Sequence, residues 1–261
     1  MGNTAVAAAI LLTGSSPTQV LRLFKSAGIA CFSKRKYDRL QRDILIPAVH
    51  KLWGRKQNSL VNSLSRAEAQ LAGDSRADSP GFCAKYGTYS LLDTSLNRII
   101  DMQLVQSSEV SSSGAMELEG LKRALKRLDD KNISVREIVT DRHVQVRSHM
   151  RQHRPDIAHY IDAWHVAKGL KKKLQAASCS RGCGVIEEWM TSIINQFYFA
   201  VKIAGRRVHT AAERGELAVA IWLPLLNHVQ DKHCGHSGEY ANCEHGDLLP
   251  RKWIFLGTSI Y

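Results

Sequence analysis

Three aspartates in this sequence have the residue type and the spacing that metal-dependent chemistry requires. Asp74 lies near the start of the stretch 73–81, and Asp141 and Asp162 each follow a short apolar run. Carboxylates are hard oxygen ligands that suit Mg²⁺ or Mn²⁺. Two such ions about 4 Å apart can activate a nucleophile and stabilise the leaving oxygen in phosphoryl transfer. We therefore predict that Asp74 and Asp141 bind Mg²⁺ or Mn²⁺, with Asp162 as a further catalytic acid, in a site that cuts or joins nucleic-acid strands.

Each of these residues also has a plainer interpretation. Aspartate at the end of a strand is a common turn former, so any one of the three could be structural. We expect Asp78, which precedes a Ser-Pro-Gly sequence, to build a turn rather than to bind metal. His143 and His165 follow two of the acids and could contact phosphate or assist proton transfer. Surface or packing roles for both histidines stay open.

A second group of residues has the chemistry of a zinc site. His228, His233, Cys243 and His245 follow the pattern His-x4-His-x9-Cys-x-His. Imidazole and thiolate are the usual ligands of structural zinc. The spacing is compatible with a loop, but it is less specific than paired Cys-x-x-Cys motifs. The pattern is therefore compatible with a structural zinc site, and equally with histidines and a cysteine that have no common role.

The charge balance favours a polyanionic partner. The chain of 261 residues has a formal net charge of +12 and a pI of about 9.6, and such an excess of Lys and Arg favours nucleic acid. We predict DNA as the partner, although basic residues can also form a solvated helix face. The candidate contact residues lie in two groups: Arg35, Lys36, Arg39, Lys168, Lys171, Lys172 and Lys173.

The elements that must position these residues begin with helices. Ser16, Pro17 and Gly28 are suited to the start and end of a helix over 16–28, and a basic helix is predicted over 34–44. The order of helix, short turn and basic helix is that of a helix-turn-helix. The two helices could instead form a helical segment that leads into the main domain. Pro47 should break the pattern, and a third helix is expected over about 48–67.

A mixed sheet is predicted next. Strands are expected over 69–72, 85–92, 98–106, 135–140 and 158–161, the first being the weakest because Ala and Gln are poor strand formers. Helices are expected over 115–130 and 143–153 and from about residue 165. This order predicts an α/β fold: a ribonuclease H-like mixed five-stranded sheet flanked by helices. In that fold the first strand lies beside the fourth.

The remainder is predicted to be helical. Apolar residues recur at three and four over 186–201, and a second helix over 211–232 should be kinked at Pro224. The predicted organisation is a helical N-terminal region (1–67), a catalytic core (68–175) and a C-terminal all-helical insertion (176–261). The apolar face of 186–201 could instead bind a partner, and a homo-oligomer stays open.

Composition limits where the protein could act. The cysteines are scattered without a dense framework, which favours a reducing compartment. No apolar run approaches the roughly 20 residues of a membrane span. The apolar run at 5–12 is short for a signal peptide and lacks a preceding Lys or Arg. We expect a nuclear or cytoplasmic protein that is not secreted and does not enter a membrane.

Several motifs resemble a known family. The stretches 73–81, 84–89, 116–123, 140–143 and 162–168, with 192–195 and 251–253, are together similar to transposon-derived proteins of animal genomes, related to Mutator-like and hAT-like DDE transposases. This resemblance implies a ribonuclease H-like core and Mg²⁺-dependent cleavage and transfer of DNA ends. It implies that Asp74 is the first catalytic acid and Asp141 the second. The assignment of Asp162 comes from its position alone, because Trp164-x-x-Lys departs from the family's Cys/Trp-x-x-His motif.

The third acid of the family has no match. Such transposases place a Glu after a helical insertion, and no late Glu here lies in a similar motif, so we expect the final helix and its Glu to be missing. Glu119 or Glu117 could substitute, by analogy with ribonuclease H. Three functions remain open: a transposase-type DNA strand-transfer enzyme, either active or inactive; a domesticated or decayed transposase that holds DNA without cutting it; and a partner-binding protein.

Overall fold

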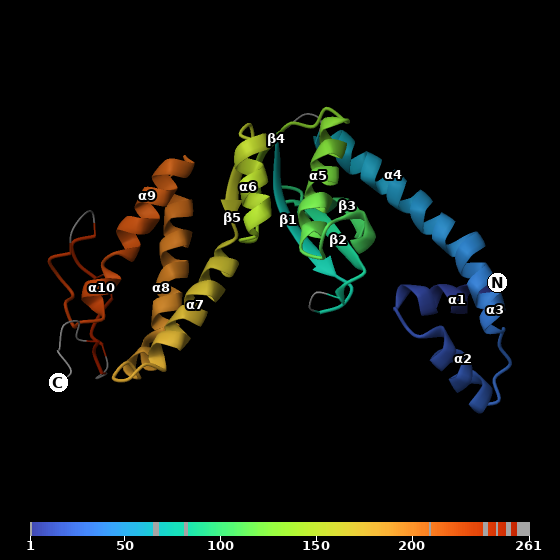
Figure 1. Ribbon diagram of the computed structural model, residues 1–261, viewed down its shortest axis with the longest axis horizontal. Coiled ribbons are helices and arrows are strands. Elements are labelled where there is room, and N and C mark those ends of the chain that lie inside the picture. The colour runs from blue at the N-terminus through green and yellow to red at the C-terminus, as the bar shows by residue number, and fades with distance from the viewer. Residues whose placement is uncertain are drawn as a thin grey trace. The chain divides into compact units, whose positions relative to one another are not determined.

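The computed structural model describes residues 2–64, 68–80, 83–208, 210–236, 240–243, 245–248 and 252–254 (Figure 1). The chain divides into two compact units, Met1–Glu137 and Ile138–Tyr261. The boundary falls inside strand β4 (Val135–Thr140). No helix in the described ranges is long and apolar enough to cross a membrane.

The first unit opens with helices α1 (Gly2–Leu12), α2 (Pro17–Ser26) and α3 (Lys34–Leu40). The cap predicted for α2 is confirmed, because the Ser16 hydroxyl accepts from the Gln19 amide. Helix α3 is capped in the same way, with the Ser33 hydroxyl accepting from the Lys36 amide. Residues 5–12, identified from the sequence only as an apolar run, lie in α1. Their apolar side packs in a small core with residues of α3 and the following turn: Ala7, Ile10, Tyr37, Leu40 and Leu45.

The prediction that Pro47 breaks the helical pattern is wrong. A π-helical turn (Gln41–Leu45) joins α3 directly to α4 (Ile46–Leu64). The Ile46 amide donates to the Gln41 carbonyl, five residues back. Proline lacks an N–H and crowds the carbonyl of the preceding turn. A wider π turn just before it, of the kind found as single-turn bulges, lets the helix continue.

A five-stranded sheet with the order β3-β2-β1-β4-β5 follows, made of β1 (Ala69–Ala77), β2 (Tyr86–Asp93), β3 (Arg98–Gln106), β4 and β5 (Ala158–Ile161). The first three strands pair antiparallel. The predicted bounds of β3, β4 and β5 are confirmed. Strand β1 is longer than predicted, because its pairing with β2 runs from Leu71 to Ala77.

Helix α5 (Ala115–Asp129) packs on the sheet through Tyr89 of β2. This side chain is 1% exposed, and two glycines leave room for it. A Cβ on Gly73 would lie 2.2 Å from the Tyr89 hydroxyl, and a Cβ on Gly120 would lie 2.4 Å from the Cβ of Tyr89. These glycines therefore allow β1 and α5 to approach β2 closely.

A buried polar network joins α4 to the sheet and to α5. The Gln57 amide donates to the Ile100 carbonyl (3.0 Å) and to the Asp101 carboxylate (2.8 Å), and Arg127 donates to its Oε1 (2.7 Å). Gln103 donates to the second oxygen of Asp101. Buried polar groups with partners of this kind specify one arrangement of the elements around them.

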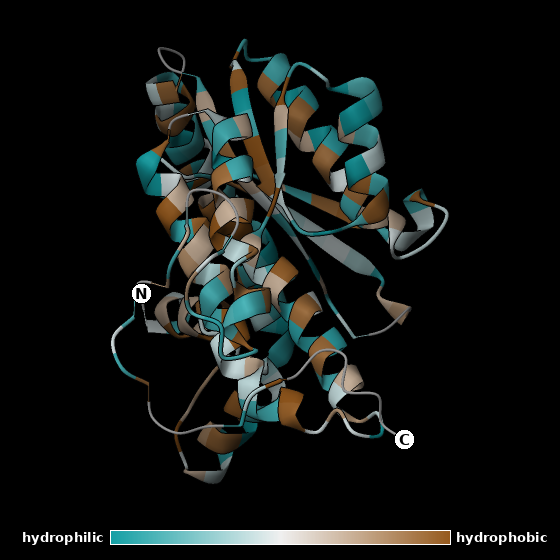
Figure 2. Ribbon diagram, turned by 90° about the vertical axis from the view of Figure 1, so that its left-hand side faces the viewer, coloured by the Kyte–Doolittle hydropathy of each residue, from teal (hydrophilic) through white to brown (hydrophobic). Residues whose placement is uncertain are grey.

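The second unit is mostly helical: α6 (Val144–His153), α7 (Ala163–Ser178), α8 (Val185–Arg207), α9 (Ala211–Trp222) and α10 (Leu225–His228). The predicted long helix over 211–232 is interrupted rather than kinked, since α9 ends before Pro224 and α10 begins after it. Figure 2 shows brown and teal residues mixed along the helices, as expected for amphipathic helices. Trp189 and Ile193 on the apolar side of α8 pack against Leu225 and Val229 in a core of this unit.

Candidate metal centre and acidic residues

Asp74 lies within β1 rather than after it, and its side chain is exposed. Its Oδ1 accepts from the Ser75 amide at 2.8 Å, and it forms no ion pair with a described residue. Ser75 donates to the Glu117 carboxylate of α5 at 3.0 Å. Because successive strand residues point to opposite faces, Asp74 points away from α5.

The structure does not bring Glu119 to Asp74. Glu119 accepts from Arg123 Nε at 2.7 Å, and the same guanidinium donates to Glu109 at 2.8 Å. The hydrogen bond to Glu119, followed by that to Glu109, raises the pKa of Arg123. Glu119 is therefore engaged in an ion pair on α5.

Asp78 has the role predicted for it. Its carboxylate accepts from the Lys85 amide at 3.1 Å, and its own amide donates to the Tyr86 carbonyl at 3.0 Å. These bonds close the connection between β1 and β2. Gly81, the last residue of the motif 73–81, lies outside the described residues.

Asp141 and Asp162 stand at the ends of neighbouring strands in the second unit. The Asp162 amide donates to the carbonyl of Thr140, the last residue of β4, at 2.8 Å. The Asp141 carboxylate accepts from the His143 amide at 2.8 Å, and the Asp162 carboxylate caps α7 through the Trp164 amide at 2.9 Å. Neither aspartate forms an ion pair within the described residues.

The histidines around these two aspartates differ in their surroundings. His143 occupies the N-cap position of α6 without a side-chain capping bond, and its Nδ1 is buried without a hydrogen bond to the described residues. The His165 ring packs edge-on against Trp164 at 4.7 Å. His159 Nε2 lies 2.8 Å from the Thr140 hydroxyl, and burial, with a smaller effect of Arg147, lowers the pKa of His159. His159, which the sequence did not single out, is therefore neutral at pH 7.

The four residues predicted as zinc ligands come together. One potential ligand atom from each of His228, His233, Cys243 and His245 lies within 4.8 Å of all the others. Cys243 Sγ is 3.4 Å from His228 Nδ1, and His245 Nε2 is 3.2 Å from His233 Nδ1. The centroids of the three imidazole rings are 4.9 Å apart in every pair. This cluster could hold a metal ion.

Short backbone elements bring these ligands together. His228 ends α10, and Asp231 turns the chain with a positive φ of 63°. The Cys243 amide then donates to the His233 carbonyl at 2.9 Å, next to an isolated bridge between Cys234 and Asn242. The cluster therefore depends on a turn and a two-strand contact rather than on a long element.

Other polar groups lie within hydrogen-bond distance of the ligands and fix their orientation. Asp231 Oδ1 is 3.0 Å from His233 Nε2, and the Gly246 carbonyl is 2.6 Å from His245 Nδ1. His236 Nε2 lies 3.3 Å from Cys243 Sγ. Asp231, His236 and Gly246 lie within a few residues of a ligand, but no sequence pattern marks them as its partners.

The ligands also have aromatic neighbours. Trp253 lies 5.4 Å from the His233 ring, and Trp189 lies 5.7 Å from the His228 ring and donates through Nε1 to the Lys252 carbonyl. In this environment burial, and secondly Cys234, raise the pKa of the Cys243 thiol. Without a metal ion the thiol is therefore protonated at neutral pH.

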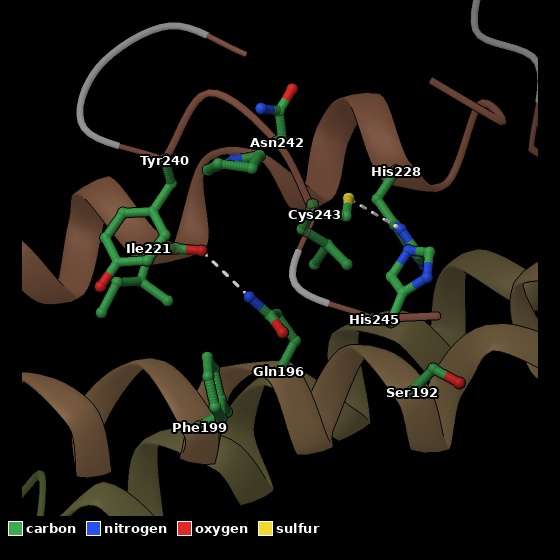
Figure 3. A pocket seen from close by; sticks show the side chains of 11 residues that line it. Ser192, Gln196, Phe199, Ile221, His228, Tyr240, Asn242, Cys243 and His245 are labelled. Atoms are coloured by element: carbon green, nitrogen blue, oxygen red, sulfur yellow. Dashed lines mark hydrogen bonds between the residues drawn. The ribbon is translucent and has the colours of Figure 1, made fainter. Parts of the chain in front are cut away.

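A cavity of about 340 Å³ begins at this cluster. Figure 3 shows His228, Cys243 and His245 at one end of it, and Gln196, bonded to the Ile221 carbonyl, along its wall. Its polar lining includes Tyr240 and Asn242. Three of the four potential ligands therefore line the cavity.

The predicted nucleic-acid contacts are exposed on two helices. Arg35, Lys36 and Arg39 lie on α3, and Lys168, Lys171, Lys172 and Lys173 lie on α7. None of them forms an ion pair with a described acid. Lys168 lies over the ring of Trp164, at 4.7 Å from its centroid. Both helices therefore present positive charge that is not neutralised within the described chain.

No protein-family model, curated protein or solved structure matches this chain.

Proposed function

We propose that this chain is a ribonuclease H-like domain that performs metal-dependent phosphoryl transfer on DNA, as the DDE transposases it resembles do. The observation that carries the proposal is the strand order β3-β2-β1-β4-β5, with Asp74 in β1 and Asp141 directly after β4. In this order β1 lies beside β4, and the ribonuclease H-like fold likewise has its first strand beside its fourth.

Backbone hydrogen bonds support the directions that the fold requires. The Ala69 amide at the start of β1 donates to the carbonyl of Ser134, just before β4, at 2.9 Å. Neighbouring strands whose first residues meet run in the same direction. The hydrogen bond from the Asp162 amide to the Thr140 carbonyl joins the residue directly after β5 to the last residue of β4, so these two strands also run in the same direction. Functional groups gather where the carboxyl ends of such strands meet.

The acids suit a hard cation. Asp74, Asp141 and Asp162 each use one oxygen to accept from a backbone amide, and none is neutralised by a described Lys or Arg, although the chain has a net charge of +12. Mg²⁺ or Mn²⁺ held by these carboxylates would stabilise the charge that develops in phosphoryl transfer. In this proposal Asp74 and Asp141 are the principal ligands, and Asp162 is the third.

The other residues bind and position DNA. The exposed lysines of α7 contact phosphates, and Trp164 beside Lys168 offers an aromatic face to an unpaired base. His143 and His165 follow two of the acids and are available to hold a phosphate oxygen or move a proton. Each of these roles needs DNA beside the second unit's strand ends.

The experiment is a nicking assay with supercoiled DNA and Mg²⁺ or Mn²⁺. We expect Asp74→Asn and Asp141→Asn to lower nicking at least 100-fold. Asp78→Asn is the matched control, since asparagine keeps the oxygen that accepts from the Lys85 amide, and it should retain nicking. Wild-type rates in both the Asp74 and Asp141 variants would refute the catalytic assignment.

A second function is favoured by the exposed lysines of α7: the domain holds DNA without cutting it. It predicts no nicking by the wild type, together with binding that weakens as salt rises. Replacing Lys171, Lys172 and Lys173 with Gln should then reduce the salt slope by about 0.9 for each lost phosphate contact. Lys202→Gln on α8 is the control, and an unchanged slope in the triple variant would exclude this surface.

A further inference from the structure

We propose that His228, His233, Cys243 and His245 bind one Zn²⁺ ion in a closed, four-coordinate site that fixes residues 240–243, 245–248 and 252–254 onto α8 and α10. This inference is independent of the proposed activity on DNA. It assigns a structural ion to the second unit, with ligands different from the carboxylates discussed above.

The distances are close to those that tetrahedral zinc imposes. Zn–N bonds of about 2.0–2.1 Å and Zn–S bonds of about 2.3 Å place neighbouring ligand atoms about 3.3–3.7 Å apart. The contact of 3.4 Å between Cys243 and His228 lies within this range, and that of 3.2 Å between His245 and His233 lies just below it. All four ligand atoms lie within 4.8 Å of one another, so an ion would draw the widest pair together by about 1 Å.

The hydrogen bonds behind two ligands select the tautomers that zinc requires. Asp231 Oδ1 accepts from Nε2–H of His233, which leaves His233 Nδ1 free to bind metal. The Gly246 carbonyl accepts from Nδ1–H of His245, which leaves Nε2 free. These two free nitrogens are the atoms that lie 3.2 Å apart. A carboxylate or carbonyl behind a metal-binding histidine is the usual arrangement in metal sites.

His236 orients the Cys243 sulfur through a similar hydrogen bond. The Asn227 amide lies 3.2 Å from His236 Nδ1, and His236 Nε2 lies 3.3 Å from Cys243 Sγ. With the Asn227 amide donating, the His236 ring carries its proton on Nε2 and donates it to the sulfur. His236 is buried, so this bond is protected from water. His236 is therefore a positioning residue that favours the thiolate form of Cys243.

The local fold explains why an ion would matter here. Helix α10 spans four residues, and the contact between Cys234 and Asn242 is an isolated bridge. Such short elements have little stability of their own. Zinc that joins the end of α10 to Cys243 and His245 would supply folding free energy to this region. The adjacent cavity gives the ion an entry path.

The first experiment measures the metal content of the purified full chain and the absorption spectrum after replacement of zinc by Co²⁺. We expect about one zinc per chain and the spectrum of tetrahedral cobalt with one thiolate ligand. Cys243→Ser should abolish the thiolate-to-cobalt band, and His245→Ala should lower zinc affinity at least 100-fold. Cys179→Ser and His50→Ala, both at exposed positions, should leave content and spectrum unchanged.

A second measurement avoids variants that fail to fold. Zinc is removed from the wild-type chain with a chelator and restored while tryptophan fluorescence is recorded, because Trp189 and Trp253 contact the ligand rings. We expect a reversible change that saturates at one equivalent. His236→Phe should weaken zinc binding about 10–100-fold, and His236→Gln, which keeps an N–H donor, should recover part of it.

Three results would overturn the proposal. The first is a wild-type chain that contains no zinc and gives no fluorescence change when zinc is added. The second is a cobalt spectrum in which Cys243→Ser has no effect. The third is a five-coordinate cobalt spectrum with bound water, which would contradict a closed site.

Discussion

Replacing Gly120 with alanine should destabilise the first unit, although alanine is the better helix former. The new Cβ would lie 2.4 Å from Cβ and 3.2 Å from Cγ of Tyr89. Carbon atoms normally approach to about 3.5–4.0 Å, so α5 or β2 must move by about 1 Å. Tyr89 cannot turn aside easily, because it is 1% exposed and its hydroxyl fills the space beside Gly73.

The magnitude follows from two opposing terms. Overpacking of a filled core costs about 1–3 kcal/mol, whereas alanine in place of glycine inside a helix gains about 0.5–1 kcal/mol. We therefore expect the free energy of unfolding to fall by up to about 2.5 kcal/mol. Gly54 is the matched control, since it lies inside α4 of the same unit and, apart from its chain neighbours and the adjacent backbone of its own helix, no described atom lies within 4 Å of its Cβ position.

The two alanine variants should shift stability in opposite directions. Gly54→Ala should gain about 0.5–1 kcal/mol through the same helix propensity, so the difference between the variants isolates the steric term. The assay is amide hydrogen exchange of β1 and β2 peptides in the full chain, which reports the opening free energy of this unit. Equal stabilisation by both substitutions would refute the close approach of α5 to Tyr89.

Further predictions concern the buried network, the metal cluster and the start of α7. Gln57→Ala should cost about 1–3 kcal/mol, because it leaves buried partners of the amide unsatisfied; urea unfolding measures this, and Asn58→Ala, at an exposed position, should stay within about 0.5 kcal/mol. Zinc affinity should fall as pH falls, since burial raises the pKa of the Cys243 thiol and its proton must leave when metal binds; competition titrations across pH measure this, and a flat profile would show that the thiol is not a ligand. Asp162→Ala should cost about 1 kcal/mol in thermal unfolding through the lost cap of α7, and equal losses in Asp162→Asn would show that the charge, rather than the cap, matters.

Much of the sheet could be predicted from local sequence, but the length of β1 could not. The run 135–140 is rich in β-branched residues and became β4 with the predicted bounds. Strand β1 has Ala, Gln and Gly at positions where strand propensity is low. Its length is set by pairing with β2 and by the space that Gly73 leaves for Tyr89. Those are tertiary contacts, which the local sequence does not encode.

The metal cluster was predictable in its ligands but not in its support. Histidine and cysteine are rare enough that six of them within residues 228–245 stand out, and four of these are the proposed ligands. The roles of Asp231 and His236 depend on a left-handed turn at Asp231 and on a ring orientation set by Asn227. Neither has a sequence pattern. Similarly, the exposed face of Asp74 became definable only once Ser75 was seen to contact α5.

The two proposed metal sites should not compete for one ion, because their ligands differ in hardness. Asp74, Asp141 and Asp162 offer only oxygen, which suits Mg²⁺ or Mn²⁺, whereas the C-terminal cluster offers imidazole nitrogen and one sulfur, which suit zinc. A chelator selective for zinc, added with excess Mg²⁺, should therefore release the structural ion and leave the carboxylates loaded. If nicking then persists while the tryptophan fluorescence changes, the zinc centre stabilises its own part of the second unit and has no part in the chemistry. If both are lost together and both return with zinc, the ion also maintains the helices that bring DNA to the acids.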